Sequence, residues 1–151
     1  MKKGQGATEY LVLLAVVLIV ALVAIALLGF FPQLGGTAKV TQSKSYWQGA
    51  EPLAITSYKI TNANVALVVQ NNGQEKLNVT NISLDGTNII ATSYSIASGK
   101  KLTITGTVFP AGTCSGGVGD NFQFQNVTLT YNTPSFNAVA QSGQPFIGQC
   151  S

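Results

Sequence analysis

The chain has 151 residues with eight basic side chains, all lysine, no histidine and five acidic residues, so that only 9% of it is charged. The lack of histidine excludes Ser-His and Cys-His catalytic relays, and the acids are isolated from one another, so neither an enzyme nor a bound cofactor is expected. The lysines are scattered along the sequence, and we expect no basic patch for nucleic acid.

An uncharged apolar run follows a short basic and polar segment at the N-terminus. The run from Leu11 to Phe31 has no charged or strongly polar side chain, so a helix formed by it would be apolar on every face. At about 1.5 Å per residue such a helix reaches roughly 30 Å, the thickness of the hydrocarbon core of a bilayer. Lys2 and Lys3 precede it, and the positive-inside rule therefore places the N-terminus in the cytoplasm and the rest of the chain outside. No small-residue cleavage pattern follows the run, which predicts that the helix is retained.

Glu9 is an acid almost directly ahead of this run. One interpretation is an anion in the first helical turn, where the helix dipole favours a negative charge by about 0.3 to 1 kcal/mol. The other depends on the string Lys2-Lys3-Gly4-Gln5-Gly6-Ala7-Thr8-Glu9-Tyr10-Leu11. This string resembles the class III signal peptide of archaeal type IV pilin-like proteins.

The resemblance implies how the chain would be processed and assembled. A prepilin peptidase would remove residues 1–4 by cutting between Gly4 and Gln5, on the cytoplasmic side of the retained helix. Glu9 would then be the fifth mature residue, where pilins place a glutamate that is thought to meet the N-terminal amine of a neighbouring subunit. The implied partners are copies of the chain itself, the peptidase and the membrane assembly machinery. The product would be a surface filament for adhesion or cell contact, whose core helices are transmembrane before assembly.

The apolar run leads into a predicted stalk. Pro32 is followed by two glycines, which predicts that the helix ends or kinks near 32–36, and a helix is expected to resume over 37–48. Residues 5–48 would thus form the apolar helix and stalk. Tyr46 and Trp47, shortly before Pro52, resemble the junction of stalk and head in related archaeal pilins, and both are predicted to be anchors in the core beneath the head.

The hydrophobic pattern changes to a period of two after this junction. Strands are predicted over 54–60, 65–69, 76–84, 88–91, 101–109 and 122–131. A bulge is needed within 76–84 if Leu77, Val79 and either Ile82 or Leu84 are all to face the core. Asp85-Gly86 predicts a tight turn. About seven short strands indicate an antiparallel β-sandwich of immunoglobulin-like type over 49–151, and an α+β chain as a whole.

Cys114 and Cys150 are the only cysteines, and both lie in the part expected outside the cell. An even count in that compartment favours a disulfide, which would stabilise the head by about 4 kcal/mol and tie the C-terminal segment to a glycine-rich loop. The alternative is a pair of free thiols that bind a metal, but the chain has no histidine and no CxxC spacing to complete such a site.

The exterior of the head must obtain its polarity from Asn, Gln, Ser and Thr, because charges are few. Three N-glycosylation sequons lie among these residues, beginning at Asn78, Asn81 and Asn126. Each is a candidate site, since a bound sugar would help to hydrate a surface that is poor in charge.

Two classes of function are compatible with these features. The first is a structural subunit of a type IV-like pilus, with an archaellum-type filament subunit as a variant. The second is a membrane-anchored extracellular binding module that does not polymerise. The two classes differ at the Gly4–Gln5 junction, because only the filament subunit requires the cut there.

Overall fold

The computed structural model describes residues 5–29, 31–107 and 110–151; of residues 5, 27–29 and 31–35 it describes the backbone only. The chain divides after Ala38 into an N-terminal helical unit and a second unit, Lys39–Ser151, which contains the head. The α+β class expected from the sequence is confirmed, with helix first and antiparallel sheets after it.

Two helices occupy the region predicted as apolar helix and stalk. Helix α1 spans Gln5–Gly29 and α2 spans Phe31–Gly49. Pro32 falls in the first turn of α2, where its missing N–H would have no partner within the helix in any case. The helix predicted over 37–48 is confirmed and begins earlier than expected, since Gly35 and Gly36 lie inside α2. The domain boundaries and the kink near 32–36 stay predictions.

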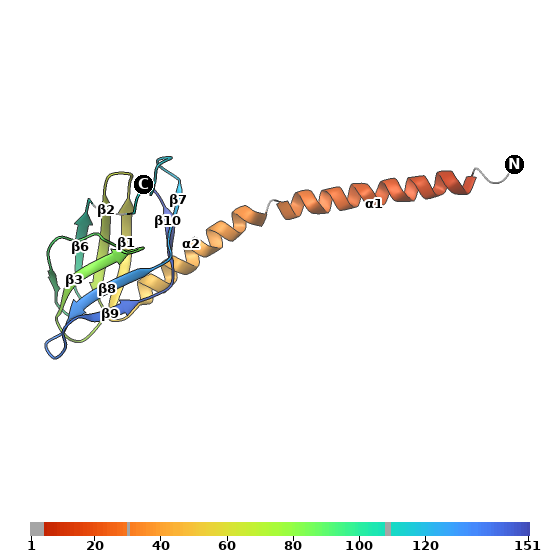
Figure 1. Cartoon of the computed structure of the whole chain (residues 1–151). Helices are drawn as coiled ribbons and strands as arrows, with labels where there is room; N and C mark the ends of the chain where they lie inside the picture. Colours follow the sequence, from red (N-terminus) through yellow and green to blue (C-terminus); the bar gives the residue numbers. More distant parts are fainter. Residues whose placement is uncertain (1–4, 30, 108–109) are drawn as a thin grey trace. The chain divides into compact units, whose positions relative to one another are not determined.

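The head is built from three antiparallel sheets, as far as the described residues show (Figure 1). Their strands are β1 (Leu53–Ile60), β2 (Val65–Asn71), β3 (Leu77–Leu84), β4 (Thr87–Asn88), β5 (Tyr94–Ile96), β6 (Lys101–Gly106), β7 (Asn121–Phe124), β8 (Val127–Asn132), β9 (Val139–Ser142) and β10 (Phe146–Gln149). One sheet has the order β1-β2-β6, a second pairs β10 with β7, and the third has the order β4-β3-β8-β9 with β5 also on β3.

Alternating side chains from facing strands form one core. On β2 the buried positions are Val65, Leu67 and Val69, and on β8 they are Val127, Leu129 and Tyr131. The two-stranded sheet lies beside β1, because the backbone N–H of Ser151, just after β10, donates to the carbonyl of Ile60 at 2.9 Å. The sheets therefore pack in a sandwich-like manner. The immunoglobulin-like type stays a prediction.

Two local expectations for the strands are confirmed. In β3 the register shifts between Val79 and Asn81, and this bulge lets Leu77, Val79, Ile82 and Leu84 all face the core. Asp85 and Gly86 both have positive φ, 47° and 84°, as a tight turn that matches the twist of a hairpin requires.

Two predicted strands need correction. The segment 122–131 is two strands in different sheets, because its buried positions change parity between Phe124 and Val127 and one straight strand cannot bury both sets. The segment 88–91 is a strand only up to Asn88, since Ile89 and Ile90 are both buried and two successive side chains cannot face one side of a strand.

The end of α2 is part of the head. Trp47 is fully buried, its ring lies edge-on to Phe146, and its indole N–H donates to the carbonyl of Gln144 at 3.2 Å. Ser43 is also buried; its hydroxyl donates to the carbonyl of Pro145 and accepts the N–H of Ile147, both at 2.9 Å. The Ser43 hydroxyl thus provides hydrogen-bond partners for two backbone groups at the start of β10.

The anchor prediction is confirmed for Trp47 and wrong for Tyr46. The side chain of Tyr46 is 39% exposed and meets the Trp47 ring edge-on at a centroid distance of 5.3 Å. Adjacent residues on a helix point in directions about 100° apart, so Trp47 points into the core while Tyr46 lies at its margin, with its ring beside Gly143.

Candidate assembly region and the surface of the head

The sequence predicts proteolytic processing at the N-terminal junction between Gly4 and Gln5. Gly4 lies outside the described residues, and Gln5 is the first residue of α1. The structure therefore leaves the cut between these two residues as a prediction.

Glu9 is an exposed residue of α1. Because α1 already includes Gln5, Glu9 lies in the second helical turn, and the first turn of α1 holds no acidic residue. The helix dipole acts mainly within the first turn, so this position does not favour the interpretation of Glu9 as a helix-start anion, and the role of Glu9 stays a prediction. Val12 and Leu13, three and four residues further on, lie on the same helix face. Glu9 is thus a single carboxylate beside an apolar surface.

The apolar side chains of α1 are exposed in this single chain. Every described side chain from Gly6 to Ala26 is exposed, with large apolar residues between 45% and 66% exposed. This segment has 21 residues and is long and apolar enough to cross a membrane. Burying one leucine or isoleucine fully is worth about 1.5 to 3 kcal/mol, so a surface of this size requires lipid or other helices around it.

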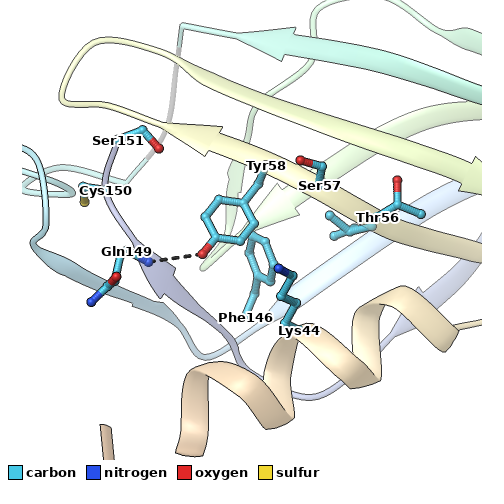
Figure 2. A pocket seen from close by; sticks show the side chains of 9 residues that line it. Lys44, Thr56, Ser57, Tyr58, Phe146, Gln149, Cys150 and Ser151 are labelled. Atoms are coloured by element: carbon cyan, nitrogen blue, oxygen red, sulfur yellow. Dashed lines mark hydrogen bonds between the residues drawn. The ribbon is translucent and has the colours of Figure 1, made fainter. Parts of the chain in front are cut away.

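The head has a groove between the facing edges of β1 and β10, floored by α2 (Figure 2). Its volume is about 360 Å³. Lys44 enters it from α2, and the hydroxyl of Tyr58 spans the gap to accept the backbone N–H of Gln149 at 3.2 Å. The groove offers one amine and several hydroxyls, but none of its lining residues is an acid or a histidine, so it lacks an acid–base pair for catalysis.

Sequence reasoning missed this groove. It exists because β10 runs beside β1 without joining it fully, and the predicted strands did not include β10. The sequence carries only a weak signal for β10, since Phe146–Gln149 is four residues long and contains a glycine.

The predicted disulfide is confirmed. Cys114 and Cys150 are bonded, with their Cα atoms 5.7 Å apart. The bond attaches the C-terminal segment to the loop between β6 and β7, where the side chain of Asp120 also accepts the backbone N–H of Gly116 at 2.7 Å. The described residues contain no free cysteine and no group of three or more side chains suited to a metal ion.

The three sequon asparagines differ in exposure. Asn126 is exposed, in the short connection between β7 and β8, and its backbone N–H donates to a side-chain oxygen of Asp85 at 2.7 Å. Asn78 and Asn81 are half-buried on β3. The Oδ1 atom of Asn81 is buried and has no hydrogen-bond partner within the described part of the chain.

One family model matches the N-terminal part of the chain. Residues 2–28 match the family model of the class III signal peptide. Comparison with curated proteins finds no match. The signal peptide and the apolar α1 together fit a type IV pilin-like protein, and they indicate a secreted subunit of pilin-like or archaellin-like kind.

The signal peptide family also indicates the class, the processing and the location of the protein. It points to a structural pilin-type protein rather than an enzyme, and in general it implies processing by a prepilin peptidase and assembly into filaments. The location that fits is a membrane-anchored precursor followed by an extracellular filament.

Proposed function

We propose that this protein is the structural subunit of an archaeal type IV-like pilus that serves adhesion or cell contact. In this proposal the α1 helices of many copies pack together as the filament core, and the β-heads cover the outside. The observation that carries the proposal is the exposed apolar surface of Gly6–Ala26, which lies within the part of the chain that matches the class III signal peptide. Packing against copies of itself would bury this surface once the helix leaves the membrane.

The proposed cut after Gly4 makes Gln5 the new N-terminus and keeps α1 whole. Glu9 would then lie inside the helix bundle of the filament. A buried carboxylate without a partner costs several kcal/mol, so Glu9 would need a partner in the assembled state. The amine of Gln5 in a neighbouring subunit is the proposed partner.

Intact-mass measurement of the subunit from its native membranes tests the processing step. We expect the mass to correspond to a chain that begins at Gln5. A Gly4→Leu variant should keep residues 1–4 and yield no filaments. Gly6→Ala is the matched control, because an added Cβ at Gly6 meets no atom within 4 Å, and it should be cut and assembled normally. A mature chain that begins at Met1, or beyond Phe31, would contradict the proposal.

A second candidate, the membrane-anchored binding module, is favoured only by the groove between β1 and β10. Electron microscopy of sheared surface material separates the two. Filaments that contain this chain support the subunit, whereas abundant chain at the surface with no filaments supports the anchored module.

A further inference from the structure

Within its strands, the sheet that contains β3 and β8 has an uncharged outer face. Read from the strand register, its cross-strand rows are Asn88-Ser83-Thr128-Ser142, Asn81-Thr130-Ala140 and Ser95-Asn78-Asn132. All of these side chains are amides, hydroxyls or a methyl group. The opposite face of the same sheet is the apolar core. Water or another neutral, hydrogen-bonding group therefore suits these rows, and the exposed carboxylate of Asp85 lies at their end, in the turn after β3.

The three sequons converge on this face. Asn78 and Asn81 belong to β3, with the bulge between them keeping both on the outer side. Asn126 is exposed in the connection just before β8, and its carbonyl accepts the N–H of Asp85 at 2.8 Å, which places it at the end of the β3–β8 ladder. The fold thus brings Asn81 and Asn126, which are 45 residues apart in the sequence, to the same sheet.

The contacts of each asparagine rank the three as sugar attachment sites. Asn126 is exposed, and within the described residues its side-chain amide makes no hydrogen bond, so Nδ2 is open to a large substituent. Asn78 is half-buried between Ser95 and Asn132. Asn81 is the least suited, because its Oδ1 is buried. The side-chain amide would have to turn out of this buried position before its nitrogen could carry a sugar.

Residues near the end of α2 contact the head away from β3 and β8. Ser43 binds the backbone around β10, and Gln48 donates to the carbonyl of Thr56 in β1 at 3.3 Å. Tyr46 and Trp47 lie against Gly143, just after the edge strand β9. Asn78, Asn81 and Asn126 are therefore not among the residues that these contacts of α2 involve.

We propose that this face is the glycan-bearing surface of the head and that Asn126 is its principal N-glycosylation site. The donor is an oligosaccharide activated as a glycosyl phosphate. The anomeric C–O bond breaks with its electron pair leaving on the phosphate, a C–N bond forms to Nδ2 of Asn126, and Nδ2 gives up one proton to a base. The proposal depends on the proposed function only because the head must be exported, and it does not require that the chain forms a filament.

Lysine-specific proteolysis of the full-length subunit from native membranes separates the candidates. The chain has no lysine after Lys101, so residues 102–151 contain Asn126 as their one sequon, while residues 77–100 contain both of the others. We expect mass spectrometry to find an added oligosaccharide mass on 102–151. Asn126→Gln and Thr128→Ala should abolish it, and Thr128→Ser should keep it because the sequon requires a hydroxyl.

Asn81→Gln is the matched control, since it removes a sequon of the same face and should leave the mass on 102–151 unchanged. An unmodified 102–151 peptide, or sugar on 77–100 alone, would overturn the proposal. Failure of the proposed function would instead be seen as an uncut N-terminus or as missing filaments, which are separate measurements on the same protein.

Discussion

Replacing Asn71 by alanine should destabilise the head far more than the same change at the next residue. Asn71 is fully buried at the end of β2. Its side-chain amide nitrogen donates to the carbonyls of Glu75 at 2.7 Å and Ile96 at 2.9 Å, and its side-chain oxygen accepts the N–H of Gly73 at 2.9 Å. The residue therefore joins the β2–β3 turn to β5 through one side chain.

The size of the effect follows from these three bonds. Each is worth about 1 kcal/mol net, and a buried group left without a partner costs about 1 to 3 kcal/mol. The carbonyl of Ile96 is buried, whereas Glu75 is exposed and water can replace its lost bond. We expect Asn71→Ala to lower the free energy of unfolding by about 3 to 5 kcal/mol. Asn72→Ala should cost about 1 kcal/mol or less, because Asn72 is half-buried and its amide makes one bond, to Ala50 at 3.2 Å.

Urea unfolding of the detergent-solubilised chain measures the difference. Trp47 is the single tryptophan and is buried in the head, so its fluorescence reports loss of head structure. With a typical slope of about 1 to 3 kcal/mol/M, Asn71→Ala should lower the midpoint by about 1 M or more relative to Asn72→Ala. Equal midpoints for the two variants would refute the reasoning that this buried hydrogen-bond network stabilises the head.

Three further changes test other parts of the argument. Glu9→Ala should leave processing and head stability unchanged and reduce the yield of sheared filaments, and a normal yield would show that Glu9 makes no essential contact between subunits. Trp47→Ala should lower the free energy of unfolding by about 3 to 5 kcal/mol, as followed by circular dichroism, while Tyr46→Ala costs about 1 kcal/mol or less; similar losses would mean that the indole is not the anchor. Cys114→Ser together with Cys150→Ser should cost about 4 kcal/mol in the same assay, and an unchanged midpoint would show that the closed loop adds no stability.

The sequence by itself determined the features that depend on neighbouring residues or on a simple count. The basic N-terminal segment, Glu9 and the uncharged run are contiguous, so length and polarity alone identify an apolar helix that is long enough to cross a membrane. Two cysteines in one exported domain leave a single intramolecular pairing, and that pairing is present between Cys114 and Cys150. The turn at Asp85-Gly86 and the bulge in β3 were also predictable, since each follows from the local pattern of side chains.

Only the tertiary structure decided which distant segments meet. The parity change between Phe124 and Val127 was visible in the sequence, but that it sends β7 to β10 and β8 to β3 depends on long-range pairing. The groove beside Tyr58, the network around Asn71 and the common face of the sequons all join segments far apart in the chain. No local signal encodes such contacts, because their stability comes from burial and hydrogen bonds that form only when the whole core is assembled.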